Sequence, residues 1–340
     1  MSKTADTLRY LPDEGLTAAV EMAIEMEIPL FITGEPGTGK TELAYWIAQN
    51  AGYRERFGIG GQVLRFNAKT TSVAKDLLYR YDAVRHFRDS QRAGGQPVNV
   101  LNYIHFEALG QAIIAARRQR SVVLVDEIDK TPRDFPNDLL FEFDKLAFRI
   151  EEAAAAELDD AHFDWKKMSS VHGMELQKPV FDEQHFIFYT DKNDLQKSRD
   201  ARKVKKPVLV LTSNSEKNLP DAFLRRCAFY HIPFPEDKAR LLEILDKKGL
   251  YKPAKNKELI NGALDFFISL RKAAGLRRKP ATAELIAWVE FLSDFEPPIN
   301  PAKELSEADW QRLLPSLSLL GKNKEDLERI GKEIKRKNQD

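Results

Sequence analysis

The feature that most constrains the fold of this chain is an eight-residue stretch, GEPGTGKT, at positions 34–41. It follows an apolar segment typical of a strand (PLFIT), precedes a helical pattern (TELAYWIAQN), and matches G-x-x-x-x-G-K-[ST] in full. Glycines in such a loop let successive backbone N–H groups point inward at a helix N-terminus, where they bind phosphate without bulky side chains. The motif predicts a nucleoside triphosphate site formed by Gly34, Glu35, Pro36, Gly37, Thr38, Gly39, Lys40 and Thr41.

Two of these side chains have a predicted role of their own. Lys40 supplies a mobile cation for the β- and γ-phosphates. The hydroxyl of Thr41 is an expected ligand of Mg²⁺. The sequence therefore predicts ATP and Mg²⁺ as the cofactors of this loop.

Residues 1–235 alternate short β-branched runs with longer amphipathic stretches. This alternation is typical of an α/β fold in which helices cover both faces of a parallel sheet. The predicted strands span residues 29–33, 63–67, 122–126, 207–212 and 229–233, and the predicted helices span 39–50, 104–118 and 137–143. The expected fold class is a P-loop α/β core.

After Pro235 the sequence shows only helical patterns, which predict a second, all-helical domain. The predicted helices span residues 236–248, 256–274, 281–293 and 307–320. We therefore expect an α/β domain over 1–235, a helical domain over 236–320 and a charged segment over 321–340, either a surface helix or a frayed tail. Residues 151–206 fit neither domain and are interpreted as an insertion.

A pair of acids, Asp126 and Glu127, follows the apolar run VVLV. Ligands of open parallel sheets bind at the carboxyl ends of the strands, which is where this pair is expected. Asp126 is predicted to hold the metal through water, and Glu127, pointing to the other side of the strand, to polarise the attacking water. The second acid separates hydrolases of this type from simple nucleotide kinases.

Two further polar positions have two interpretations each. Asn214 follows the strand PVLVLT and is a candidate to position the water or sense the γ-phosphate; an Asx turn that closes the strand is the alternative. Arg225 and Arg226 follow a short apolar helical turn. They form either a solvated surface or, if a neighbouring subunit's γ-phosphate lies there, an arginine finger acting in trans.

The charge and the apolar runs limit the partners and the location. Lys and Arg number 53 against 52 Asp and Glu, a net charge of +1, so the chain lacks the broad basic field of a nucleic-acid-binding protein. The basic run at 197–206 leaves a local contact with nucleic acid or an acidic partner open beside a solvated surface. No apolar run approaches the roughly 20 residues that span a bilayer and the N-terminus lacks an apolar signal core, so we expect a cytoplasmic protein.

With these motifs the chain resembles an AAA+ ATPase, through GEPGTGKT and VVLVDEIDK, and within that class it resembles the MoxR family. The longer matches lie at residues 76–87, 103–113, 134–152 and 212–235, and the resemblance covers most of 16–295. It implies a homo-oligomeric ring, commonly a hexamer, with ATP bound between subunits. The family uses ATP to remodel or mature a partner protein, often one that carries a von Willebrand factor A domain.

The resemblance also implies roles for individual residues. It supports Lys40 and Thr41 as Walker A, Asp126 and Glu127 as Walker B, and Asn214 as sensor 1. A further implication is that an insertion at about residues 68–103 is the family's helix-2 insert, which tends to form a pore-facing loop.

For the arginine finger the resemblance points to Arg226, with Arg225 as the competitor. One element departs from the family pattern. The family carries a small-Pro-Arg triplet whose arginine acts as sensor 2, whereas this chain has Ala281 in that place. Arg278 and Lys279, just before the proline, are candidates to reach the γ-phosphate instead, with solvated helix-start charges as the alternative.

The leading functional hypothesis is an ATPase (ATP and water to ADP and phosphate) whose helical domain serves as a lid that moves with the nucleotide state. One alternative is a restriction-type NTPase subunit that works with nucleic acid, against which the neutral net charge stands. The other alternative is a regulatory switch that binds ATP and hydrolyses it slowly.

Overall fold

A computed structural model describes residues 9–337, apart from 95, 97, 117–118, 153–186, 190–205, 215–218, 274, 296–298, 302 and 304. Contacts divide the chain into two units. One holds Asp13–Thr33 and Thr41–His231, and the other holds Gly34–Lys40, Ile232–Asp340 and the start of the chain. The phosphate-loop residues thus group with the helical part of the chain, whereas the sequence predicts them to be part of the α/β domain. The domain boundaries expected from the sequence remain predictions.

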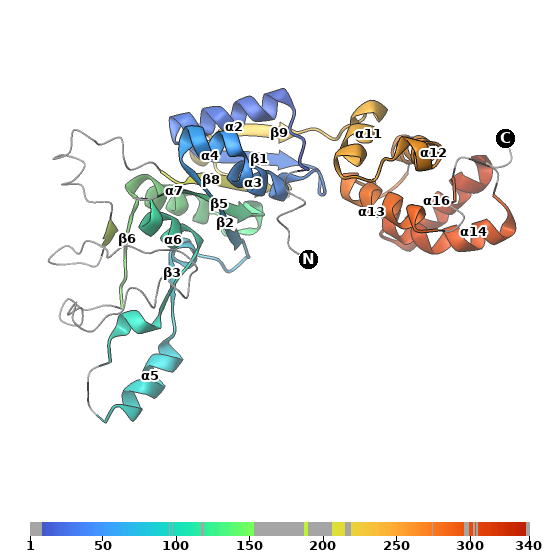
Figure 1. The fold of residues 1–340 in the computed structure, drawn as a ribbon. Coiled ribbons are helices and arrows are strands. Elements are labelled where there is room, and N and C mark those ends of the chain that lie inside the picture. Colours follow the sequence, from blue (N-terminus) through green and yellow to red (C-terminus); the bar gives the residue numbers. More distant parts are fainter. Residues whose placement is uncertain are drawn as a thin grey trace. The chain divides into compact units, whose positions relative to one another are not determined.

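The five strands expected from the sequence form one parallel sheet, in the order β2-β5-β8-β1-β9 (Figure 1). Their bounds are β1 Leu30–Gly34, β2 Ile59–Asn67, β5 Arg120–Asp126, β8 Val208–Ser213 and β9 Ala228–Ile232. In the register of β5 and β8, Val125 lies opposite Leu211, so the next residues, Asp126 and Thr212, also lie side by side. The α/β fold class is confirmed.

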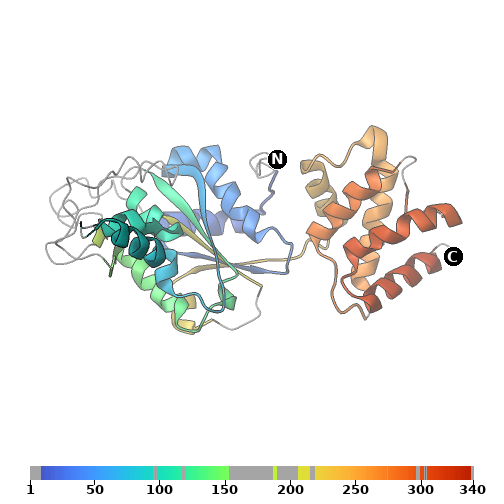
Figure 2. The ribbon, with the colours of Figure 1, turned by 90° about the horizontal axis from the view of Figure 1, so that it is seen from below.

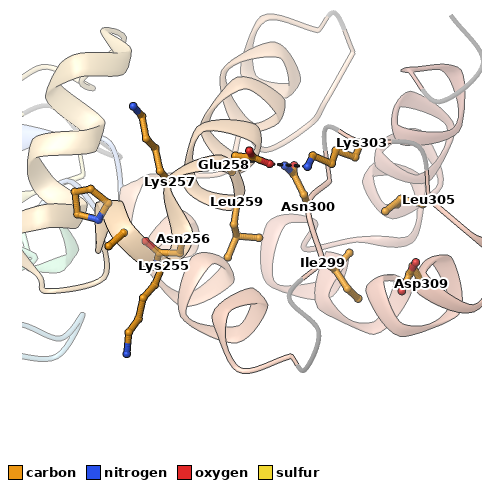
Figure 3. A pocket seen from close by; sticks show the side chains of 12 residues that line it. Lys255, Asn256, Lys257, Glu258, Leu259, Ile299, Asn300, Lys303, Leu305 and Asp309 are labelled. Carbon is orange, nitrogen blue, oxygen red and sulfur yellow. Dashed lines mark hydrogen bonds and ion pairs between the residues drawn. The ribbon is translucent and has the colours of Figure 1, made fainter.

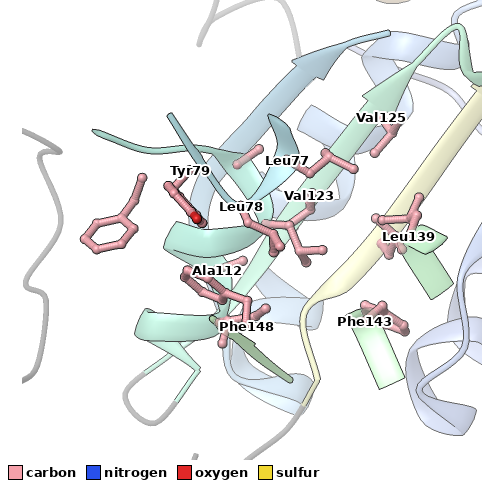
Figure 4. Close-up of a cluster of buried hydrophobic side chains, with 14 of the residues drawn as sticks. Leu77, Leu78, Tyr79, Ala112, Val123, Val125, Leu139, Phe143 and Phe148 are labelled. Carbon is pink, nitrogen blue, oxygen red and sulfur yellow. The ribbon is translucent and has the colours of Figure 1, made fainter. Parts of the chain in front are cut away.

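Helices lie on both faces of this sheet (Figures 1 and 2). Alternate residues of β5 point to opposite faces, and all seven residues of the strand are buried. On one face Val123 and Val125 pack in a cluster with Leu139 and Phe143 (Figure 4). Besides a helix at Ala83–Arg92, the helices described in this part of the chain are α2 Glu14–Met26, α3 Lys40–Gln49, α4 Ala51–Phe57, α6 Ala108–Ala115, α7 Phe135–Lys145 and α10 Asp221–Leu224.

The predicted helix over residues 104–118 is wrong at its start. Ile104–Phe106 is a strand, β4, that pairs antiparallel with β3, Tyr79–Tyr81. The pattern there has period two: Ile104 and Phe106 are buried and His105 between them is half-buried. Only from Ala108 does the helix α6 begin, because from there almost every residue is apolar and buried.

Between β3 and β4 lie the helix α5, Ala83–Arg92, and a 3-10 turn, Val100–Tyr103. None of the residues of α5 is buried, and its large apolar side chains Val84 and Phe87 are 80% and 67% exposed. Figure 1 shows α5 at the end of the hairpin, away from the sheet. This is the segment predicted as an insertion at about 68–103.

The predicted insertion at 151–206 lies almost wholly outside the described residues, as does the basic run at 197–206. Within it the structure describes one strand, β7 Ile187–Tyr189. That strand pairs antiparallel with β6, Ala147–Arg149.

The second unit contains the expected helices, packed around Trp288, Phe266 and Phe267. They are α11 Lys238–Lys247, α12 Pro253–Lys272, α13 Thr282–Ser293, α14 Glu307–Leu313, α15 Leu317–Leu320 and α16 Lys324–Lys337. The pattern at 307–320 is interrupted by a 3-10 turn, Leu314–Ser316, because Pro315 has no N–H to donate to a continuous helix. Of the two alternatives for the charged C-terminal segment, the structure shows the helix; Asp326 and Ile330 on it are fully buried.

A pocket of about 600 Å³ opens in this unit beside the start of α12 (Figure 3). Its rim carries an ion pair between Lys303 and Glu258, and its wall includes Leu259 and Ile299. None of the predicted site residues lines it. Within the described ranges, no helix has the length and apolar character needed to cross a bilayer.

Candidate nucleotide site

The phosphate loop joins β1 to α3, and its glycines take backbone conformations that other residues avoid. Gly37 and Gly39 have φ of 78° and 89°, in the left-handed region. A Cβ on Gly37 would lie 3.1 Å from the Cβ of Ala281, and one on Gly39 would lie 2.8 Å from a ring carbon of Tyr10. Both the backbone conformation and the close packing therefore require glycine at these two positions of the loop.

The loop's lysine is held within the loop itself. Lys40 is 8% exposed, and its Nζ donates to the backbone oxygens of Gly34 at 2.7 Å and Glu35 at 2.9 Å. The hydroxyl of Thr38 donates to the same oxygen of Glu35 at 2.8 Å. The ammonium is thus held by the backbone of the loop itself.

Asp126, at the carboxyl end of β5, is 8% exposed and has partners on both carboxylate oxygens. Thr212 of β8 donates its hydroxyl to Oδ1 at 2.6 Å, and Arg65 of β2 donates Nη2 to Oδ2 at 2.7 Å. The hydroxyl of Thr41 lies 3.2 Å from each oxygen. Three strands and the start of α3 therefore fix this carboxylate.

Glu127 is one of three non-glycine residues with positive φ in the described part of the chain, at φ 60° and ψ 50°. Its N–H donates to the hydroxyl of Thr212 at 3.0 Å. Its carboxylate accepts from Nδ2 of Asn214 at 3.3 Å and pairs with Nζ of Lys130 at 2.6 Å. The side chain is 41% exposed, so water reaches it.

The residues present fit Mg²⁺. A hydroxyl oxygen, on Thr41, and a carboxylate, on Asp126, lie 3.2 Å apart, and Mg²⁺ prefers oxygen ligands of these two kinds. The hydrogen bond that now joins them would be exchanged for metal contacts, through water where the ion keeps its hydration.

The structure brings Thr41, Asp126, Glu127 and Asn214 together, as the sequence predicted, although their roles remain predictions. Sequence reasoning missed Arg65, Thr212 and Lys130. The one available signal was Arg65, a charged residue inside the apolar run VLRFN. Thr212 and Lys130 have no sequence mark that separates them from ordinary strand-end and turn residues.

Arg225 and Arg226 follow α10 and are both exposed. In the described part of the chain neither guanidinium has an ion-pair partner. The next residue, Cys227, donates its thiol to the backbone oxygen of Phe223, and burial raises the pKa of the thiol to about 12. Cys227 is therefore a protonated packing residue, whatever the neighbouring arginines do.

The candidate lid cations, Arg278 and Lys279, are also exposed. The backbone N–H of Arg278 donates to the carboxylate of Asp326, which fixes the backbone there. The arginine that the structure brings to the phosphate loop is a different one: Nη2 of Arg271 lies 2.9 Å from Oε2 of Glu35.

One comparison with known proteins matches the part of the chain that contains these residues. Residues 30–147 match the family model described as "ATPase family associated with various cellular activities (AAA)", a range that includes the phosphate loop and both acids. This match supports an AAA-type ATPase domain in the chain, and with it ATP as the ligand. Comparison with curated proteins gave no match.

Among solved structures, the chain is similar to NtrX from Brucella abortus, determined in complex with ATP. The identity is 13%, the match covers 100% of this chain and 68% of that one, and the TM-score is 0.34. A likeness of this extent does not bear on function.

Proposed function

We propose that this chain is a cytoplasmic, MoxR-type AAA+ protein that hydrolyses ATP, assembles into a ring and remodels or matures a partner protein. The observation that carries the proposal is the cluster at the ends of β5 and β8. There Asp126 and Glu127 lie with Asn214 and the hydroxyl of Thr41. A nucleotide-binding protein without hydrolysis would need the loop and the metal ligand but not a water-accessible second acid held by an amide.

Each residue has a part in this reaction. Lys40 binds the β- and γ-phosphates, and Thr41 and Asp126 hold Mg²⁺. When bound, the metal neutralises charge that develops on the phosphate oxygens. Glu127 takes up the proton of the attacking water, while Asn214, through its Nδ2 contact with Oε1, keeps that carboxylate oriented toward the reacting atoms.

Exposed side chains support the proposals of a ring and of a partner protein. Arg226, with Arg225 as the alternative, is available as an arginine finger for the nucleotide of a neighbouring subunit. The exposed Val84 and Phe87 on α5 offer apolar surface to another protein. A partner with a von Willebrand factor A domain is the class that the resemblance to MoxR proteins suggests.

The test is ATP hydrolysis by the purified protein with Mg²⁺ and with a chelator, using Lys40→Ala as the inactive control. We expect Mg²⁺-dependent phosphate release that DNA does not stimulate and that a partner captured with Glu127→Gln does. Stimulation by DNA would instead identify a restriction-type NTPase subunit. Tight ATP binding with slow turnover that neither addition changes would identify a regulatory switch.

A further inference from the structure

Arg271, near the end of α12, is a nearly buried cation whose partner is the phosphate loop. Its side chain is 10% exposed and makes three contacts. The guanidinium carbon lies 3.3 Å from the centre of the Phe234 ring, Nη1 donates to the backbone oxygen of Pro280, and Nη2 lies 2.9 Å from Oε2 of Glu35. All four residues belong to the same unit of the structure.

Arg271 and Glu35 differ in how firmly their side chains are held. Phe234 and Pro280 fix the plane of the guanidinium without any help from the loop, and a planar fork held in this way loses little freedom when it binds a carboxylate. Glu35, in contrast, is 47% exposed. The arginine is therefore the fixed member of the pair and the loop carboxylate is the member that it holds.

A second contact joins the loop to the same helical region. Gly37 packs so closely on the start of α13 that a Cβ there would lie 3.1 Å from Ala281 and 3.2 Å from Ala283. A small side chain at 281 suits this approach. The cation that the helical region offers to the loop comes instead from α12, as Arg271.

We propose that the Glu35–Arg271 pair is a latch: Arg271 is a positioning residue that, through Glu35, holds the phosphate loop in its binding conformation and ties the lid helices to it. Its effect on ATP binding rests on the proposed function, but the latch itself is a property of the protein without nucleotide. Because Lys40 donates to the backbone oxygen of Glu35, loosening Glu35 also loosens the phosphate-binding lysine.

The test is hydrogen exchange of the backbone amides of the loop, residues 34–40 except Pro36, in the full chain without nucleotide. Arg271→Met and Glu35→Gln should each speed this exchange about fivefold, as loss of about 1 kcal/mol of ion pairing would. The double variant should be no faster than the faster single variant, because both changes remove one interaction. Arg312→Met is the matched control, since Arg312 also lies over a phenylalanine ring and pairs with a carboxylate in this unit.

Unchanged exchange at 34–40, or single effects that simply multiply in the double variant, would overturn the latch. If Arg271→Met does not fold, Glu35→Gln, a change at an exposed side chain, decides the question alone.

Titration with a fluorescent ATP analogue then separates the latch from the proposed function. Both single variants should bind it about fivefold more weakly, and Arg312→Met should bind it as the parent does. A parent protein that does not bind the analogue would contradict the proposed function while leaving the exchange result standing. Weaker binding of ATP but not ADP by Arg271→Met, with Glu35→Gln normal, would mean that Arg271 contacts the γ-phosphate directly and that the latch is wrong.

Discussion

The strand ends of β5 and β8 and the segment after α10 contrast sharply in how their charged groups are held. At the strand ends, Asp126 has partners on both oxygens and Glu127 is held by an amide and an ammonium. After α10, Arg225 and Arg226 are exposed and have no ion-pair partner among the residues that the structure describes. The acidic groups of the proposed chemistry are held within one chain, whereas these two arginines are open to a second molecule.

The largest expected effect tests whether Arg226 contributes to hydrolysis in a neighbouring subunit. Arg226→Ala should still bind ATP but hydrolyse it about 10³-fold more slowly, because an arginine finger stabilises the charge of the transition state. Phosphate release at matched nucleotide occupancy measures this.

The decisive control is a mixture. Arg226→Ala mixed with Lys40→Ala should regain activity, since some interfaces then join an intact lysine to an intact arginine from the neighbour. Activity of the parent should also rise faster than linearly with protein concentration. If Arg225→Ala is the inactive variant instead, the finger is Arg225; full specific activity in a dilute monomer would end the trans model altogether.

The acidic groups are tested at Glu127, whose side chain is exposed. Glu127→Gln should keep ATP binding and lower kcat about 10²-fold, or about 2.7 kcal/mol of transition-state stabilisation. Lys40→Ala, in contrast, should weaken ATP binding itself. Hydrolysis by Glu127→Gln at the parent rate would show that another group activates the water.

The amide that holds Glu127 should have a smaller effect. Asn214→Ala removes one hydrogen bond, so we expect turnover about five- to tenfold lower, which corresponds to about 1 kcal/mol. ATP affinity should stay within a few-fold, because the contact of the amide is made to Glu127. Loss of ADP and ATP affinity alike, with normal kcat, would return Asn214 to closing a turn.

The smallest expected effect concerns the metal. Arg65, which is 35% exposed, pairs with Asp126 at 2.7 Å. If Asp126 holds Mg²⁺ as proposed, Arg65 should compete with the metal for that carboxylate. Arg65→Gln should lower the Mg²⁺ concentration for half-maximal hydrolysis about two- to fivefold, the range of a partly exposed ion pair. Arg56→Gln, which breaks a surface pair with Glu21 and Glu25, is the control. A higher Mg²⁺ requirement would mean that Arg65 orients Asp126 for the metal.

The same contrast explains what the sequence could and could not predict. Strands, phosphate loop and acid pair are encoded locally, in short apolar runs and in residues a few positions apart, and the structure has all five predicted strands. The pair of Glu35 with Arg271 joins residues 236 positions apart, so no local pattern marks it. The same holds for Arg65 beside Asp126, 61 positions away. The strand β4 was missed because its three residues border an apolar helix.

The left-handed backbone of Glu127 should affect which variants survive in directed evolution of this chain. A glutamate with φ of 60° carries a conformational cost of order 1 kcal/mol, which glycine would not. Its N–H bond to Thr212 offsets part of that cost. A library of variants sorted for heat resistance alone should therefore replace Glu127 early, often by glycine, while a library sorted for ATP turnover should retain it.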